Sequence, residues 1–230
     1  MTAKPKGIRA VFLDLDGTMV DSIPDIHLAL NQMRADLSLA PLDEEKTKHF
    51  VGRGTESLVR SALAMDCDDD AVNARLPQAL VFFRRHYLET NGCCSRVYPD
   101  VMEGLRQFRE QGLSLACVTN KPAIFTDPLL AKTGLYPLLD AISSADSVPR
   151  KKPDPLPMQV LSARFGLHPS EVLVIGDSIN DVRAARSAGC SVFVVPYGYN
   201  HGQSVRDMDA DGVIPRITDA LCLISGIGAV

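Results

Sequence analysis

Long apolar runs and an apolar N-terminal segment are missing from this sequence of 230 residues. A membrane-spanning helix needs about 20 consecutive apolar residues, and no stretch here approaches that length. Residues 1–9 contain two lysines, an arginine, a proline and a glycine, without the apolar stretch that a signal peptide requires. We therefore expect a cytoplasmic protein that has no membrane partner.

An excess of either charge is also absent. Lysine and arginine total 24 and aspartate and glutamate total 28, which gives a formal charge of −4. Because the basic residues are dispersed, the sequence predicts no nucleic-acid partner. The six cysteines form no CxxC pair and have no histidine at ligand spacing, which indicates reduced thiols and no zinc site. With 46% hydrophobic residues, the chain can bury the core of one domain plus an insert.

Short apolar runs alternate with helical patterns through most of the chain. The runs have the length and the turn-like endings of strands that are buried on both faces. They cover residues 10–14, 113–119, 139–143, 172–176 and 191–195. Helical periodicity occurs at 101–110 and at 181–188, where Gly189 is placed to end the helix. The alternation predicts an α/β fold, a doubly wound Rossmann-like parallel sheet with helices on both faces.

One interval, residues 21–95, lacks a convincing strand and carries three apolar stripes with helical spacing instead. The stripes are Ile26, Leu30, Met33 and Leu37; Leu58, Val59, Ala62 and Leu63; and Leu80, Phe83, Tyr87 and Leu88. We interpret residues 21–95 as a helical cap domain that is inserted into an α/β core domain of residues 1–20 and 96–230. Such an insert would lie over the sheet edge at which the first strand ends.

Two carboxylates, Asp14 and Asp16, end the first apolar run and are followed at once by glycine and threonine. Alone, this pattern also suits a surface turn. In an open α/β sheet, however, ligands bind beyond the carboxyl ends of the strands, where both side chains would project. Asp177 ends a second run, and Asp181 follows one helical turn later. Because clustered carboxylates need a cation and Mg2+ prefers oxygen ligands, we expect a Mg2+ site formed by Asp14, Asp16 through its backbone carbonyl, and Asp177.

Four motifs in order resemble those of the haloacid dehalogenase-like hydrolases. They are the Asp-Leu-Asp-Gly-Thr of residues 14–18, the strand that ends in Thr119-Asn120, Lys152-Pro-Asp-Pro, and the run 172–181. The resemblance implies that Asp14 is a nucleophile that forms an aspartyl-phosphate and that Asp16 acts as general acid and base. The chemistry of carboxylates agrees with both roles.

The remaining motif residues fit the binding of a phosphoryl group. A hydroxyl and amides after a strand can hold a phosphoryl oxygen, which suits Thr119 and Asn120, although a threonine at a strand end is often an ordinary turn residue. Lys152 fits the cation that neutralises phosphate and keeps the nucleophile ionised, and its pKa should stay high beside the acids. Asp181 would act through water or by orienting Lys152.

Within that family, the chain looks like the bacterial phosphoglycolate phosphatases over nearly its full length. The segments that carry the likeness are 12–22, 51–54, 148–155, 176–178 and 195–202. This implies Mg2+-dependent hydrolysis of 2-phosphoglycolate, a small phosphate ester, to glycolate and phosphate. The alternatives are a phosphatase of other or broader specificity, such as one for sugar phosphates, a phosphomutase, or a non-catalytic binding module. The sequence leaves open whether the protein is a monomer or a homodimer.

Substrate specificity should come from the cap, where Arg53 lies between Gly52 and Gly54 just before a helical stripe. Glycines let a backbone approach a ligand closely, and the start of a helix offers amides to an anion. We expect Arg53 to pair with a carboxylate of the substrate through two hydrogen bonds. The alternative is an exposed loop arginine beside Thr55, which would then cap the helix.

Overall fold

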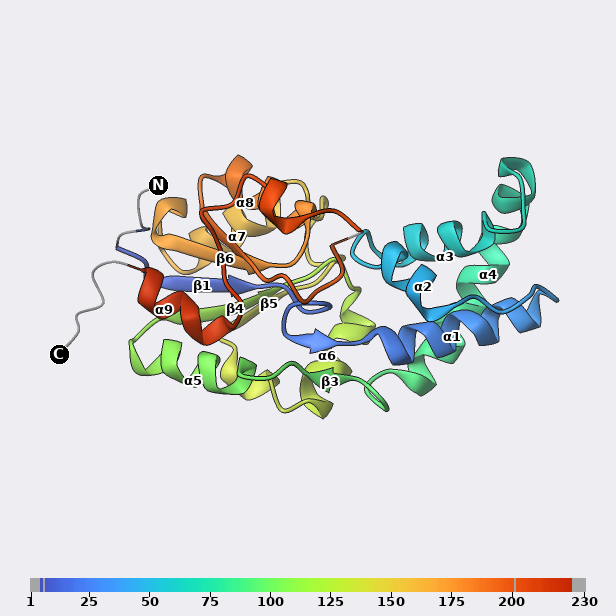
Figure 1. Cartoon of the computed structure of the whole chain (residues 1–230), viewed down its shortest axis with the longest axis horizontal. Helices are drawn as coiled ribbons and strands as arrows, with labels where there is room; N and C mark the ends of the chain where they lie inside the picture. Colours follow the sequence, from blue (N-terminus) through green and yellow to red (C-terminus); the bar gives the residue numbers. More distant parts are fainter. Residues whose placement is uncertain (1–4, 6, 201, 225–230) are drawn as a thin grey trace.

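The computed structural model describes residues 5, 7–200 and 202–224. At its centre is a six-stranded sheet in the order β5-β4-β1-β6-β7-β8, in which all neighbours are parallel (Figure 1). The strands are β1 (Ala10–Leu13), β4 (Ser114–Val118), β5 (Ala141–Ser143), β6 (Val172–Gly176), β7 (Ser191–Val194) and β8 (Gly212–Val213). The α/β fold with a parallel sheet is thus confirmed, and all five expected strands are present. The sequence analysis missed β8, whose two residues are too few to show a pattern.

Strand β1 lies inside the sheet, with β4 on one side and β6 on the other. From β1 the sheet grows outward through β4 and β5, and the chain then returns to add β6, β7 and β8 on the opposite side. This change of direction opens a crevice at the carboxyl ends of β1, β4 and β6. In open α/β sheets, ligands bind at such a point.

Helices cover both faces of the sheet. Alternate side chains of a strand point to opposite faces, so Val11 and Leu13 join one apolar cluster while Ala10 and Phe12 join the other. The first cluster also contains residues of α5 (Val101–Glu110), α6 (Ala123–Lys132) and α9 (Ala220–Leu223). The second contains residues of α7 (Leu156–Arg164) and α8 (Ile179–Ala188). In Figure 1, α7 and α8 lie on one side of the strands and α5 lies on the other.

The helix boundaries follow the sequence signals closely. Helix α5 has the predicted bounds of 101–110, and α8 begins two residues before the predicted 181. It ends before Gly189, whose φ of 86° lies in the left-handed region that glycine adopts readily. Short 3-10 helices occur at η1 (Tyr136–Leu138), η2 (Pro169–Glu171), η3 (Val205–Asp207) and η4 (Ile217–Asp219). No helix of the described residues is long and apolar enough to cross a membrane.

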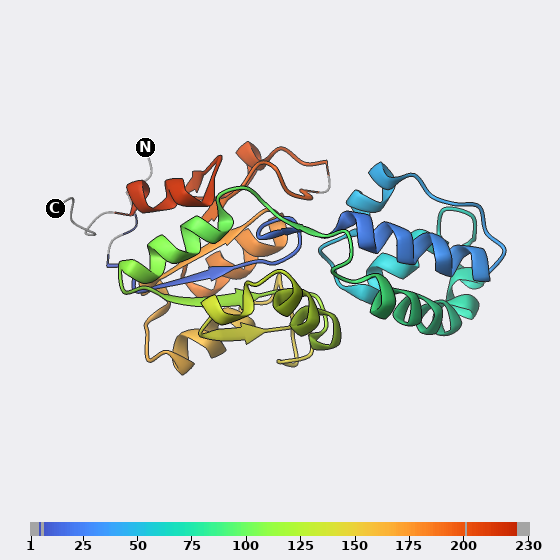
Figure 2. The same cartoon turned by 90° about the horizontal axis from the view of Figure 1, so that it is seen from below.

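Four helices within residues 23–90 form the expected helical cap, which lies beside the sheet rather than on its faces (Figures 1 and 2). They are α1 (Ile23–Asp36), α2 (Glu44–Phe50), α3 (Thr55–Leu63) and α4 (Asp69–Thr90). Their apolar side chains form a third cluster, which also includes Phe125 of α6 and Tyr199 from the core. Leu88, predicted on the buried stripe of α4, is 46% exposed instead. Phe83 and Tyr87 fill the buried face four residues apart, and the next residue is turned about 100° away from Tyr87.

The chain enters and leaves the cap through two short adjacent strands. Strands β2 (Val20–Asp21) and β3 (Arg96–Val97) pair antiparallel, with Val20 opposite Val97 and Asp21 opposite Arg96. The sequence analysis did not expect this ribbon, because two-residue strands carry no periodicity. The two ends of the insert therefore lie side by side.

Asp25 fixes the turn that leads from α4 into β3. Its buried carboxylate accepts hydrogen bonds from the backbone N–H groups of Gly92, Cys94 and Ser95, at 2.9, 2.8 and 2.9 Å. The Ser95 hydroxyl donates to it as well. One side chain of α1 thus satisfies the polar backbone of the returning chain.

Replacing Asp25 with alanine should lower the free energy of unfolding by about 3 kcal/mol, because buried N–H donors would lose their acceptor. Urea unfolding at equilibrium measures the change. Asp36→Ala is the control: its carboxylate pairs with Arg85 and His86 at the surface, and such pairs contribute about 0–1 kcal/mol. Equal small losses in the two variants would show that Asp25 does not hold the turn.

Candidate active site

The carboxyl ends of three neighbouring strands bring three predicted site residues together. Asp14 follows β1 directly, Thr119 follows β4, and Asp177 follows β6. All three side chains are buried. Because parallel strands end at one edge of a sheet, residues more than 160 positions apart in the sequence share one site.

The ammonium group of Lys152, from the loop between β5 and α7, lies between two of the acids. Its Nζ is 2.9 Å from Asp14 Oδ1 and 2.6 Å from Asp181 Oδ1, and it donates to the carbonyl of Val118 at 2.6 Å. Burial alone would lower the pKa of Lys152, but the charges of Asp14 and Asp181 outweigh it and raise that pKa above its usual range. Lys152 therefore keeps its charge at neutral pH.

Asp14, Asp177 and Asp181 form an acidic cluster in which one oxygen of each lies within 4.8 Å of the others. Burial raises the pKa of Asp14, and burial together with the charge of Asp181 raises the pKa of Asp177 to about 7. Burial disfavours the charged form of both carboxyl groups, and their closeness to Asp181 adds repulsion. A divalent cation bound by these close, buried carboxylate oxygens would offset both effects.

Asp16, the second predicted carboxylate, faces a lysine that the sequence analysis did not single out. Its Oδ1 accepts hydrogen bonds from Lys121 Nζ at 2.7 Å and from the Ser22 hydroxyl at 2.6 Å. The side chain of Asp16 is thus outside the acidic cluster, and its predicted share in a metal site, through the backbone carbonyl, stays a prediction. The signal that could have pointed to Lys121 is its place directly after the Thr119-Asn120 motif.

Asn120 joins the cap to the core. Its Nδ2 donates to the carbonyl of Gly52, on the loop before α3, and to the carbonyl of Lys152, both at 2.9 Å. Asn180 Nδ2 donates to the same Gly52 carbonyl at 3.3 Å. The side-chain amide of Asn120 is therefore engaged in holding two loops together.

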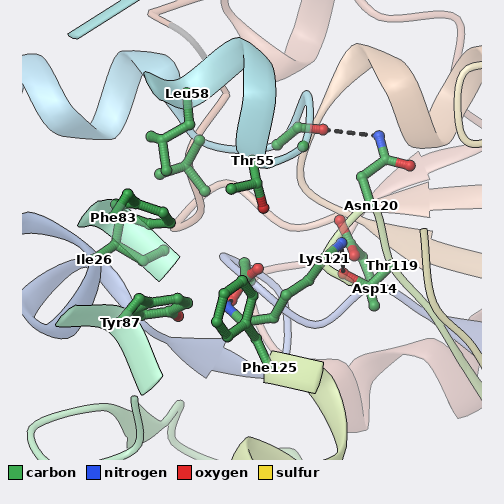
Figure 3. A pocket seen from close by; sticks show the side chains of 14 residues that line it. Asp14, Ile26, Thr55, Leu58, Phe83, Tyr87, Thr119, Asn120, Lys121 and Phe125 are labelled. Carbon is green, nitrogen blue, oxygen red and sulfur yellow. Dashed lines mark hydrogen bonds and ion pairs between the residues drawn. The ribbon is translucent and has the colours of Figure 1, made fainter. Parts of the chain in front are cut away.

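A pocket lies between the cap and this edge of the sheet, with an empty volume of about 450 Å3 that includes its open mouth. In Figure 3, Ile26, Leu58, Phe83 and Tyr87 of the cap face Asp14, Thr119 and Lys121 of the core. The pocket thus has acidic and basic groups on one wall and apolar side chains on the other. The lining therefore offers charged groups and apolar surface to the same ligand.

Arg53 does not line this pocket, although its neighbours Gly52 and Gly54 do. Its side chain is exposed, while both glycines have positive φ values, 104° and 90°, and turn their backbone toward the pocket. Thr55, the first residue of α3, also lines the pocket. The expected contact between Arg53 and the substrate therefore stays a prediction.

The loop after β7 holds Asp177 in place. The Tyr199 N–H donates to Asp177 Oδ2 at 2.6 Å, and the Tyr199 hydroxyl donates to Asp21 Oδ1 at 2.5 Å. A Cβ atom on Gly198 would lie 2.3 Å from the Cβ of Asp177, so the close approach requires glycine. The Gly-Tyr pair thus packs against a site carboxylate. His201, in the same segment, lies outside the described residues.

Comparisons with known proteins show which family this chain resembles. The family model of the haloacid dehalogenase-like hydrolases matches residues 8–189. A phosphoglycolate phosphatase of Nitrosospira multiformis is 43% identical over 96% of this chain and 97% of its own. The phosphoglycolate phosphatase of Thiobacillus denitrificans is 42% identical over 98% of this chain and 99% of its own. The crystal structure of a predicted phosphoglycolate phosphatase from Haemophilus somnus superposes with a TM-score of 0.85, at 33% identity, over 94% of this chain and 97% of that one.

Proposed function

This chain belongs to the haloacid dehalogenase-like hydrolases, and from that membership we propose that it hydrolyses 2-phosphoglycolate to glycolate and phosphate. The observation that carries the proposal is the buried ion pair of Asp14 and Lys152 at the carboxyl end of β1, beside the pocket between cap and core. Relatives that carry the name phosphoglycolate phosphatase, and that match over nearly the full chain, support the choice of substrate.

The reaction we propose proceeds in two displacements at phosphorus. A carboxylate oxygen of Asp14 bonds to phosphorus and forms an aspartyl-phosphate, while the bond from phosphorus to the glycolate oxygen breaks. Asp16 gives a proton to the departing oxygen and then accepts one from the water that attacks the aspartyl-phosphate. Lys152 counters the negative charge on Asp14 and on the phosphoryl oxygens.

Thr119 and Asn120 contribute the remaining contacts to the phosphoryl group. The Thr119 hydroxyl, which lines the pocket, donates to a phosphoryl oxygen. Because the side chain of Asn120 is engaged with two carbonyls, Asn120 contributes through its backbone N–H. Asp181 acts as a positioning residue, since its Oδ1 holds the ammonium of Lys152.

We propose Mg2+ as the cation of the acidic cluster, held by Asp14, Asp177 and the backbone carbonyl of Asp16. A divalent cation bound there would neutralise charge on the phosphoryl group and polarise it. The support is the chemistry of the donors: buried carboxylates, a raised pKa at Asp177, and the oxygen ligands that Mg2+ prefers.

Removal of divalent cations with EDTA should abolish turnover, and added Mg2+ should restore it. Ca2+ should restore much less, because it takes more ligands at longer distances. Phosphate release measures activity, and the melting temperature with and without Mg2+ measures binding independently. Full turnover in EDTA, without a Mg2+-dependent shift in melting temperature, would contradict the metal site.

We also propose that residues 21–95 move as one cap against a core of residues 1–20 and 96–230. Both parts line the pocket, so opening would admit substrate and closing would exclude bulk water while the aspartyl-phosphate forms. The hinges would lie near 21–24 and 96–99, beside the ribbon of β2 and β3.

A substrate panel tests the proposed function directly. We expect kcat/KM with Mg2+ to be about 100-fold or more higher for 2-phosphoglycolate than for phospholactate, sugar phosphates or p-nitrophenyl phosphate, a difference of about 3 kcal/mol. A flat profile would leave a phosphatase of broad specificity. Transfer of phosphate to a second sugar hydroxyl, without release of inorganic phosphate, would indicate a phosphomutase.

A further inference from the structure

Lys121 presents a positive charge to the pocket. Its side chain is 4% exposed, it lines the pocket, and its Nζ bonds to Asp16 Oδ1 at 2.7 Å. Among the described residues that line this pocket, it is the single basic one. The ion pair with Asp16 holds this ammonium group at the pocket wall.

The two buried lysines of the site differ in how their donors are used. An ammonium group has three N–H donors. Those of Lys152 meet Asp14, Asp181 and the Val118 carbonyl, which are three acceptors. The hydrogen bond from Lys121 to Asp16 uses one donor. Lys121 therefore has capacity for a further anionic partner, whereas Lys152 is saturated within the acidic cluster.

Tyr87 provides a second polar group on the opposite wall. Its side chain is 2% exposed, and its ring centroid lies 4.9 Å from Lys121 Nζ. The Tyr87 hydroxyl makes no hydrogen bond of ordinary geometry in the described part of the chain, although Lys121 lies close enough to interact with it. A buried hydroxyl without a full hydrogen bond is destabilising, and a bound carboxylate would supply the missing acceptor.

The N-terminus of α3 opens onto the same pocket. Helix α3 begins at Thr55 after Gly54, whose lack of a side chain leaves the first turn without a side-chain cap. Gly54 and Thr55 both line the pocket (Figure 3). The uncapped N–H groups and the helix dipole at this end favour an anion.

We propose that Lys121, the Tyr87 hydroxyl and the first turn of α3 form a subsite for the carboxylate of the substrate. The inference rests on the proposed function, because 2-phosphoglycolate carries a carboxylate in addition to its phosphate. The phosphate meets Asp14 and Lys152, so the second anion needs a cation of its own. Ile26, Phe83 and Phe125 add apolar surface to the pocket, which suits a short carbon chain between the two anions better than a sugar with several hydroxyls.

A matched pair of substrates tests the subsite. 2-Phosphoglycolate and 2-hydroxyethyl phosphate share two carbons and a phosphate, but only the first carries a carboxylate. We expect Lys121→Met to lower the ratio of kcat/KM for the first over the second by about 30-fold or more, whatever loss the two substrates share. Tyr87→Phe, which removes only the hydroxyl, should lower the same ratio by about 3- to 10-fold.

Two variants at basic residues nearby complete the test. The control is Lys151→Met, which removes an exposed lysine whose ammonium lies beside Gly54. Arg53→Ala tests the rival expectation that Arg53 binds the same carboxylate. The subsite would be overturned if this ratio of kcat/KM values stayed unchanged in both K121M and Y87F. It would also be overturned if K151M or R53A lowered the ratio more than K121M does. If the wild-type enzyme itself does not distinguish the two substrates, the proposed function fails. A wild-type preference that K121M retains would refute the subsite alone.

Discussion

Replacement of Asp14 with asparagine should lower kcat by about 10^4-fold or more while the protein stays folded. The amide has nearly the size of the carboxyl group but cannot form an acyl phosphate, so the covalent route is lost. Little stability should be lost, because burial already disfavours the charge of Asp14 and Lys152 keeps its contact with Asp181. Steady-state phosphate release and the melting temperature measure the two effects.

A covalent label distinguishes a lost nucleophile from a merely weakened site. Rapid acid quench with radiolabelled substrate should trap phosphate on the wild-type protein and none on Asp14→Asn. Asp127→Asn serves as the control, since this side chain is exposed on α6 and outside the pocket. Turnover by the Asp14 variant at more than a few per cent of the wild-type rate would assign the nucleophile to another group.

Replacement of Lys152 with methionine should reduce both activity and stability strongly. Methionine has a similar length but no charge, so Asp14 and Asp181 would lose the ammonium that lies between them. Loss of one partner from a buried ion pair costs about 3–5 kcal/mol. The phosphoryl oxygens would lose a cation as well, and we expect kcat to fall by about 10^3-fold.

Urea unfolding in EDTA gives the stability of the Lys152 variant without any contribution from metal. Lys151→Met is the matched control, because its side chain is exposed one position earlier and should change the free energy of unfolding by less than about 0.5 kcal/mol. Similar free energies of unfolding for K151M and K152M would mean that the folded protein does not need the charge of Lys152 to stabilise the acidic cluster. We would then expect its carboxyl groups to be protonated in the metal-free protein.

The parts of the fold that could be predicted are those with a local signal. Strands β1 and β6 are buried on both faces, so their sequences read as continuous apolar runs. Asp14 and Asp177 stand directly after these runs, and the parallel arrangement alone brings them to one edge. Helix α5 has a strongly amphipathic pattern and was predicted with its observed bounds.

The parts that were missed depend on contacts between distant segments. The pairing of Lys121 with Asp16 spans 105 positions, and the bond from Tyr199 to Asp21 spans 178. Neither lysine nor tyrosine carries a sequence pattern that tells whether it is buried against an acid. Arg53 illustrates the reverse case: its flanking glycines do shape the pocket, but the direction of the side chain is set by backbone angles that the sequence does not state.

The side-by-side strands β2 and β3 make the cap a closed loop of chain with its two ends in register. Gene recombination at β2 and β3 could exchange the whole insert for another. Strands β1, β4 and β6 and the site residues that follow them would keep their sequence. A different cap would then change the substrate specificity while the catalytic residues of the core stay the same. Lys121 belongs to the core, so any new cap would form a pocket that still contains the positive charge of this lysine.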